Sequence, residues 1–144
     1  MKLSLLIPSY RGGNRLPELL IRLEALLTRP QFAGSEVILV DDGSDDGSWE
    51  RIRSEAEARP WLRAFRLPAN YGQQTATLFG LSRCSGEWIA TLDDDLEHPP
   101  EELAELLPCR EAGYELIFGV RRVEYSSPVR RLGAGLRDLI FRGV

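Results

Sequence analysis

Short apolar runs alternate with longer amphipathic stretches along this chain of 144 residues. A short apolar run between turn signals predicts a buried strand, whereas apolar residues recurring three and four positions apart predict a helix. The predicted strands cover residues 3–7, 37–40, 62–67, 88–92 and 115–119. The predicted helices cover residues 16–28, 48–58, 73–84, 101–111 and 129–141, and Asn14 is a candidate cap for the first of them.

Regular alternation of strands and helices predicts a mostly parallel sheet with helices on both faces. The length suits a single domain with its own core, so we expect one three-layer α/β/α sandwich over residues 1–144. Ligands of such sheets bind beyond the carboxyl ends of the strands. The residues that follow the predicted strands are therefore the first candidates for a site.

Polar and acidic residues follow three of these strands. Pro8-Ser9-Tyr10 follows the first, Asp41-Asp42 the second, and three consecutive aspartates, Asp93 to Asp95, follow the fourth. Clustered carboxylates repel one another unless a positive group lies among them, and a divalent cation held by oxygen ligands is the economical partner. A helix N-terminus decorated with acids is the alternative, but it would account for only one or two of the three.

The charge distribution narrows the choice of partners. The net charge of −4 does not favour nucleic acid as a partner. From Arg121 onward, however, six arginines stand against two acidic residues, so the basic excess lies in the tail. The sequence predicts no signal peptide and no membrane span, and its two cysteines lack a metal-binding spacing. We expect a cytoplasmic protein that is soluble or peripheral on the cytoplasmic membrane face.

Five motifs occur in an order and spacing that resemble a known family. They are Ile-Pro-Ser-Tyr at 7–10, Val-Asp-Asp-Gly-Ser-Asp-Asp-Gly-Ser at 40–48, Asn-Tyr-Gly-Gln-Gln at 70–74, Asp-Asp-Asp-Leu-Glu-His-Pro-Pro at 93–100 and Phe-Gly-Val-Arg at 118–121. Together they resemble family-2 glycosyltransferases of the GT-A type, especially those that use polyprenyl phosphates. The resemblance implies a metal-dependent, inverting transfer of sugar from a nucleotide-diphosphate donor to an acceptor such as dolichyl or undecaprenyl phosphate.

The resemblance also implies roles for the acidic residues after the fourth strand. Asp95 would be the main metal ligand, and Asp93 would contact the metal or the donor ribose, which makes these two the catalytic pair. Asp94 would be the variable middle position. Glu97 stands where the family often has glutamine, and it is either an additional metal ligand or a solvated acid at a helix start. Carboxylate oxygens suit Mg²⁺ or Mn²⁺.

The remaining implied contacts belong to the two substrates. Asp41 would bind the nucleobase, with Asp42 near the ribose and Pro8 and Tyr10 lining the nucleoside pocket. A simple turn with a helix cap is the alternative for the segment after the second strand.

Two arginines of the tail are the candidates for the acceptor side. Arg121 and Arg131 would bind the phosphate of a polyprenyl phosphate, because guanidinium groups form bidentate contacts with phosphates. We therefore expect a donor-binding core over 1–120 and a basic acceptor or membrane-proximal segment over 121–144. The apolar stripe of the last predicted helix would rest on an anionic membrane face or pack on the domain.

Two departures from the family pattern keep other functions open. Arg11-Gly12 replaces the usual Asn-Glu pair, and family members continue beyond the length of this chain. A truncated or non-catalytic module that binds a nucleotide sugar or a metal is therefore the alternative. A phosphoryl-handling α/β domain is less favoured, because the sole lysine is Lys2 and the aspartates follow the fourth strand rather than the first.

Overall fold

Four parallel strands form one sheet in the computed structural model, which describes residues 2–117 and 119. The strands are β1 (Leu3–Ser9), β2 (Glu36–Asp41), β3 (Leu62–Arg66) and β4 (Trp88–Thr91). Their order across the sheet is β3-β2-β1-β4, so β1 and β2 are central. Every residue of β1 and β2 is buried, which explains their nearly continuous apolar sequences.

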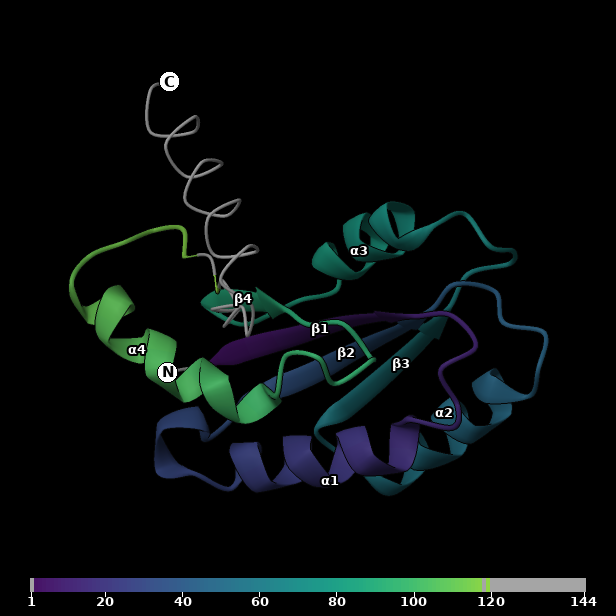
Figure 1. Ribbon diagram of the computed structural model, residues 1–144, viewed down its shortest axis with the longest axis horizontal. Coiled ribbons are helices and arrows are strands. Elements are labelled where there is room, and N and C mark those ends of the chain that lie inside the picture. Colours follow the sequence, from purple (N-terminus) through teal and green to yellow (C-terminus); the bar gives the residue numbers. More distant parts are fainter. Residues whose placement is uncertain (1, 118, 120–144) are drawn as a thin grey trace, which may run out of the picture.

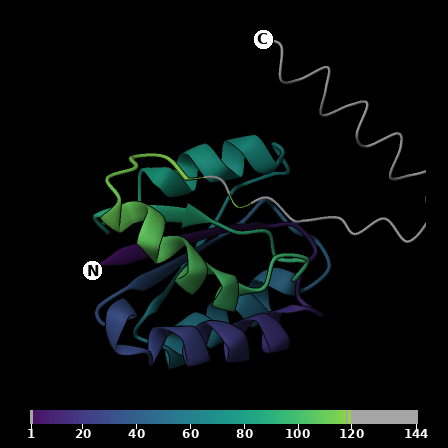
Figure 2. The same ribbon diagram turned by 60° about the vertical axis from the view of Figure 1, so that its left-hand side comes forward.

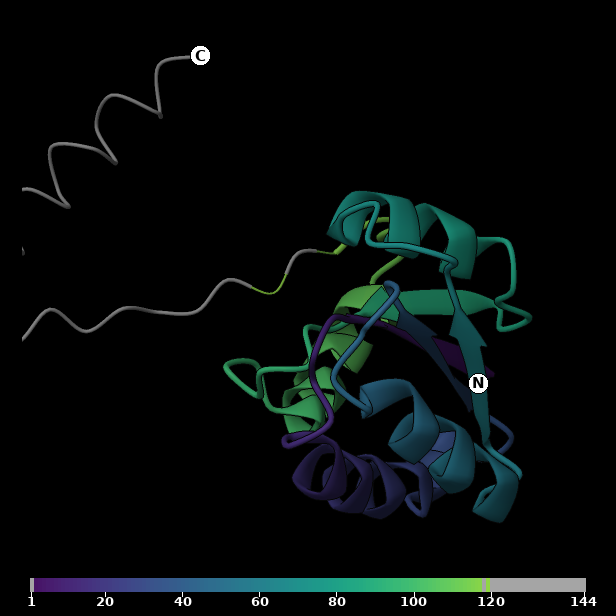
Figure 3. The same ribbon diagram turned by 90° about the vertical axis from the view of Figure 1, so that its right-hand side faces the viewer.

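Helices cover both faces of this sheet (Figures 1 and 3). On one face, α3 (Gln73–Leu81) lies against β1 and β2. The other face carries α1 (Leu16–Leu27), α2 (Ser48–Ala58) and α4 (Leu103–Glu111). Two short 3-10 helices, η1 (Pro30–Phe32) and η2 (Pro100–Glu102), precede β2 and α4, and Figure 2 shows α4 on the same side of the sheet as α1. The predicted three-layer α/β/α arrangement is confirmed.

The core consists of two apolar clusters, one on each side of the sheet. The larger cluster joins alternate residues of β1 and β2 to the apolar stripe of α1; its members in these three elements are Leu3, Leu5, Ile7, Leu16, Leu19, Leu20, Leu23, Leu26, Val37 and Leu39. The smaller cluster lies under α3. There a methyl group on Gly80 would overlap the side chain of Leu6, so this glycine allows α3 to lie close to the sheet.

The buried carboxylate of Glu36 stabilises one edge of the sheet, opposite the edge at which the aspartates follow the strands. Glu36, at the start of β2, accepts hydrogen bonds from the hydroxyls of Ser4 (2.8 Å) and Ser85 (2.6 Å) and from the Ser85 backbone N–H (2.8 Å). Arg63 Nη1 donates to its other oxygen at 3.0 Å. Burial alone would raise the pKa of Glu36, but these hydrogen bonds outweigh burial and lower it to about 2. The carboxylate therefore links β1, β2, β3 and the segment before β4 in its charged form.

Pro8 lies inside β1, although the sequence predicted that this strand ends before it. It pairs in register with Val40 of β2 on one side. On the other side, the last register pair between β1 and β4 is Leu6 with Thr91. The missing N–H of Pro8 therefore costs no bond to β4, which has already ended at this level.

Other element boundaries also differ from the predictions. Arg15, not Asn14, is the N-cap residue of α1, and the side chain of Asn14 instead accepts a hydrogen bond from Arg51 at 3.0 Å. The third helix ends at Leu81, three residues earlier than predicted. The predicted strand at 115–119 is wrong for residues 115–117 and 119, which are not in a strand. An apolar run forms a buried strand only where a neighbour receives it, and Leu116 is 71% exposed here.

The predicted helix at 129–141 lies outside the described residues. Within the part that the structure describes, no helix is both long and apolar enough to cross a bilayer.

Candidate functional site

The carboxyl ends of β1, β2 and β4 bring the predicted acidic residues to one edge of the sheet (Figure 1). Three segments form this edge. They are residues 9–15, here called the β1 loop, residues 41–44 at the end of β2, and residues 93–97, here called the acidic loop. Side-chain hydrogen bonds connect the β1 loop to each of the other two segments. The candidate site is thus a single connected structure rather than three separate turns.

Asp41 has a buried acceptor atom that is left unused. Its side chain has no exposed surface. Oδ2 accepts the Ser44 backbone N–H at 3.1 Å and lies 3.4 Å from Arg66 Nε. Oδ1 is buried and has no hydrogen-bond partner among the described residues. Burial raises the pKa of Asp41, and the bonds from Ser44 and the charge of Arg66 oppose that rise. A buried acceptor without a donor is costly, so Oδ1 is suited to an N–H or O–H group from a ligand.

Arg66 is a site residue that the sequence reasoning missed. Besides its approach to Asp41, its Nη2 donates to the Ser44 carbonyl at 2.6 Å. Its guanidinium lies 6.0 Å from the ring of Trp49, within the range of a cation–π contact. The available signal was its place at the end of β3, which ends at the same edge of the sheet.

Asp42 holds the loop that precedes α3. It is 3% exposed, and its carboxylate accepts the backbone N–H groups of Tyr71 at 2.9 Å and Gly72 at 2.8 Å. Gly72 has a φ of +89°, a conformation that favours glycine. The bonds leave Tyr71 57% exposed beside the site. The implied contact of Asp42 with a ribose stays a prediction, and the geometry gives its carboxylate a clear internal role.

Asp94 is fixed by three hydrogen bonds to the β1 loop. Its Oδ2 accepts from the hydroxyl of Ser9 at 2.5 Å, and its Oδ1 accepts from Arg15 Nη2 at 2.6 Å. Arg15 Nε also donates to the Asp94 carbonyl at 3.1 Å. A Cβ at Gly12 would overlap both the Asp94 carboxylate and the Ser9 hydroxyl, so the absence of a side chain at Gly12 makes room for this arrangement.

Asp93 and Asp95 flank Asp94 and are exposed. Asp93 Oδ1 accepts from the Gln73 side chain at 2.5 Å, and Asp95 Oδ1 accepts the Glu97 backbone N–H at 2.9 Å. Leu96, which lies between Asp95 and Glu97, has a positive φ of 63°, and this conformation turns the backbone sharply. The acidic loop therefore presents its first and third carboxylates to solvent while holding the second inside.

The described residues fit a metal ion only when a ligand completes its coordination. In residues 2–117 and 119, no three His, Cys, Asp or Glu side chains are grouped so that they could hold a metal ion by themselves. Mg²⁺ is commonly held by one or two carboxylates together with substrate phosphates and water. The exposed carboxylates of Asp93 and Asp95 match that requirement, and the exposed Glu97 lies two residues further on.

The other predicted site residues have different surroundings. Pro8 is buried in β1, whereas Tyr10 is 39% exposed and has the Arg11 guanidinium 5.1 Å from its ring. Arg121 and Arg131 lie outside the described residues.

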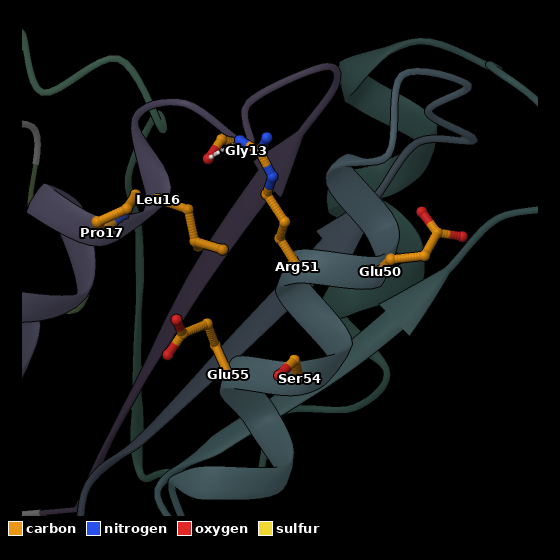
Figure 4. A pocket seen from close by; sticks show the side chains of 7 residues that line it. All are labelled: Gly13, Leu16, Pro17, Glu50, Arg51, Ser54 and Glu55. Atoms are coloured by element: carbon orange, nitrogen blue, oxygen red, sulfur yellow. Dashed lines mark hydrogen bonds between the residues drawn. The ribbon is translucent and has the colours of Figure 1, made fainter.

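A cavity of about 510 Å³ lies between the start of α1 and the face of α2 (Figure 4). It is lined by Gly13, Leu16, Pro17, Glu50, Arg51, Ser54 and Glu55. None of the predicted site residues lines it. Arg51 is already bonded to the Asn14 side chain and, at 3.4 Å, to the Gly13 carbonyl. The cavity adjoins the β1 loop at Gly13, but the chemistry described above does not involve it.

The parallel sheet, the buried acceptor of Asp41 and the acidic loop define an α/β domain with a polar site beyond its strand ends. The sequence profile of glycosyl transferase family 2 matches residues 4–138. The chain belongs to this family.

Curated relatives share this sequence at substantial identity. An undecaprenyl-phosphate 4-deoxy-4-formamido-L-arabinose transferase from Yersinia enterocolitica is 38% identical over 98% of this chain and 43% of the relative. The transferase of the same name from Pseudomonas savastanoi is 42% identical over 89% of this chain and 38% of the relative. The chain thus spans about two fifths of the length of these relatives.

Solved structures share the fold. Staphylococcus aureus TarS in complex with UDP-GlcNAc superposes with a TM-score of 0.65 and 25% identity, over 88% of this chain and 38% of TarS. The mannosyltransferase PcManGT from Pyrobaculum calidifontis, in complex with GDP-Man and Mn²⁺, gives a TM-score of 0.68 and 22% identity, over 86% and 36%. The GT-A fold class expected from the motifs is confirmed.

Proposed function

We propose that this chain forms the donor-binding part of an inverting glycosyltransferase that moves a sugar from a nucleotide diphosphate to a polyprenyl phosphate. Membership of family 2 and the names of the curated relatives support the reaction class. The TarS complex with UDP-GlcNAc supports a nucleotide-sugar donor. In this proposal residues 1–120 are the donor core and residues 121–144 the acceptor or membrane-proximal segment.

The observation that carries the proposal is the buried, unpartnered Oδ1 of Asp41. A nucleobase carries N–H groups at its edge, and one of them would satisfy this acceptor. Binding of the base would thereby remove the cost of an unmet buried hydrogen bond, which gives the donor a reason to bind at this point of the sheet. The exposed rings of Tyr10 and Tyr71 are available to line the nucleoside, and Asp42 holds the Tyr71 loop. Pro8 of β1 would line the same pocket.

The acidic loop would receive the diphosphate end of the donor. Asp93 and Asp95 would hold Mg²⁺ or Mn²⁺, with Glu97 as a further oxygen ligand. When bound, the ion would act as a Lewis acid that neutralises charge on the departing diphosphate. The chain's own residues supply the rest, because Asp41 fixes the base while Asp93 and Asp95 fix the other end of the same molecule. The donor is thereby oriented with its anomeric carbon toward the acceptor.

The acceptor would bind to residues 121–144. A phosphate acceptor is already an anion, so attack on the anomeric carbon needs no strong general base. Arg121 and Arg131 would bind that phosphate through bidentate contacts. A polyprenyl acceptor lies in a membrane, so we propose a peripheral position on the cytoplasmic face of the membrane.

Thermal stability measured with a panel of donors tests this function. UDP-, GDP- and dTDP-sugars, each with and without Mn²⁺, should include one that raises the melting temperature more strongly when the metal is present. No shift with any of them would contradict donor binding. A clear shift without sugar transfer to a polyprenyl phosphate would instead identify the chain as a nucleotide-sugar-binding module.

A further inference from the structure

We propose that Asp94 is a positioning residue that locks the acidic loop to the β1 loop and thereby sets the places of Asp93 and Asp95. What the acidic loop binds rests on the proposed function. The contact of Asp94 with Ser9 and Arg15, here called the lock, is present in the protein without any ligand. The lock gives the middle aspartate a role of its own. Ser9 and Arg15 bond to Asp94, and Gly12 leaves room for its carboxylate.

Both oxygens of the Asp94 carboxylate are engaged by the β1 loop. Its side chain is 13% exposed, and each oxygen has a donor from the β1 loop, Ser9 for Oδ2 and Arg15 for Oδ1. Hydrogen bonds in which at least one partner is ionised are shorter and stronger than those between neutral groups, and both of these are short. A metal ligand needs an oxygen that points to the ion. In this structure both oxygens of Asp94 point to the protein instead.

The lock acts on the backbone as well as on the side chain. Arg15 donates Nη2 to the Asp94 carboxylate and Nε to the Asp94 carbonyl, so one guanidinium holds both. Arg15 is also the N-cap residue of α1, whose helix is packed into the larger core cluster. Arg15 therefore attaches the acidic loop to a rigid element, in addition to the bond from Ser9 at the end of β1.

Gly12 shows that the surroundings are shaped for this contact. The space that a Cβ would take at this position holds the Asp94 carboxylate and the Ser9 hydroxyl. An alanine would push these two groups out of their places, although it carries no atom that could bind a metal. Gly12→Ala therefore separates the lock from metal ligation.

The adjacent residues make the lock relevant to the site. Asp93 and Asp95 are bonded to Asp94 through the chain, and their carboxylates accept hydrogen bonds from the Gln73 side chain and from the Glu97 N–H, respectively. Groups that orient the ligands of a metal typically change its affinity by 10- to 100-fold when they are removed.

Amide exchange measured by NMR on the free protein tests the lock without any ligand. In Arg15→Gln and in Asp94→Asn, we expect exchange of the residue 95–97 amides to rise on the order of tenfold, because the loop opens more often. Arg53→Gln is the matched control, since it removes an exposed arginine that pairs with Glu57 on α2, away from this loop. Unchanged exchange in Arg15→Gln and Asp94→Asn would overturn the proposal.

Calorimetric titration with UDP, and with GDP in parallel, tests the consequence. The gain in affinity on adding Mn²⁺ should fall on the order of 10- to 100-fold in Asp94→Asn, Arg15→Gln and Gly12→Ala. Binding without metal should stay as in the wild type in each folded variant. The Arg15→Gln/Asp94→Asn double variant should be no worse than either single variant, because both remove the same contact.

The other outcomes are equally decisive. Additive losses, or a loss in Asp94→Asn that Arg15→Gln does not share, would make Asp94 itself a metal ligand and overturn the lock. Equal losses with and without metal would indicate general destabilisation and overturn it too. A wild-type protein with no metal-dependent gain would contradict the proposed function, and the exchange measurement would still decide on the lock.

Discussion

The carboxylate of Asp42 accepts the backbone N–H of Gly72 at 2.8 Å and so ties the end of β2 to the loop before α3. The neighbouring N–H of Tyr71 donates to the same carboxylate. The two consecutive aspartates after β2 thus differ in their hydrogen-bond partners. Both carboxylates are buried, but Oδ1 of Asp41 has no partner among the described residues, whereas both oxygens of Asp42 accept backbone N–H groups of the loop beside it.

Replacing Asp42 should therefore loosen that loop. In Asp42→Ala the Tyr71 N–H loses its acceptor and the Gly72 N–H keeps only its bond to the Asn70 side chain, and we expect the free energy of unfolding to fall by about 1–3 kcal/mol. Chemical denaturation measures the change, and amide exchange of Tyr71 and Gly72 locates it. Asp45→Asn is the control, because Asp45 is exposed and pairs with Arg11 at the surface. Equal stability of Asp42→Ala and wild type would show that these two bonds contribute nothing.

Asp41 should lower the stability of the free protein and increase its affinity for the donor. Burial raises its pKa above the ordinary 3.8, so the folded protein holds this proton to higher pH than the unfolded chain does. Its contribution to stability consequently falls as the pH rises from the pKa of Asp41 in the unfolded chain to its higher pKa in the folded protein. Asp41→Asn removes the buried charge and keeps an acceptor for Ser44, and we expect its melting temperature at neutral pH to equal or exceed that of the wild type.

The same variant should bind the donor poorly. Loss of a charged acceptor for the base corresponds to roughly 1.5–3 kcal/mol, or a 10- to 100-fold weaker affinity for the nucleotide. Calorimetric titration measures it. A variant that is less stable yet binds normally would contradict both the unmet acceptor and its proposed ligand.

Glu36 should govern the acid stability of the sheet. Its pKa is about 2 in the folded protein, below the ordinary 4.5, so its contribution is complete above 4.5 and is lost as the pH falls toward 2. The difference corresponds to about 3 kcal/mol. Denaturation at several pH values should show a steep loss for the wild type in this interval and a shallower one for Glu36→Gln. Parallel curves for the two proteins would contradict the role of this carboxylate.

Asp95 should be required for any effect of the metal. We expect Asp95→Ala to abolish the Mn²⁺-dependent part of the donor-induced thermal shift and to leave the metal-free part. Glu97→Gln in the same assay distinguishes its two interpretations, because only a ligand would weaken the metal-dependent part. An undiminished shift in Asp95→Ala would contradict the metal assignment.

The fold was predictable because its central strands are buried on both faces. Their unbroken apolar sequences and the helical spacing of the leucines in α1 carry that information locally. Boundaries were less predictable. Pro8 lies inside β1 beyond Leu6, the last residue of this strand in register with β4, and residues 115–117 are not in a strand although Leu116 and Ile117 are apolar. Both outcomes depend on neighbours that the local sequence does not specify.

The same reasoning applies to the candidate site. The aspartates were visible as residues that follow strands, and their convergence followed from the parallel topology. The functions of Arg15, Arg66 and Gly12 were not visible, since each depends on a contact with a distant segment. The resemblance set Asp94 apart as the variable middle position, but its bonds to Ser9 and Arg15 could not be predicted, because they depend on where the β1 loop lies.

The contacts that build this edge span long stretches of chain, with 30 residues between Asp42 and Gly72 and 85 between Ser9 and Asp94. Closing such loops costs entropy before any contact compensates for it, so these bonds form late in folding. A partly folded chain that has assembled only β1, β2 and β3 would still lack the acidic loop. Under the proposed function, metal-dependent donor binding would therefore report that β4 has joined the sheet, and it would serve as a kinetic marker for completion of the fold.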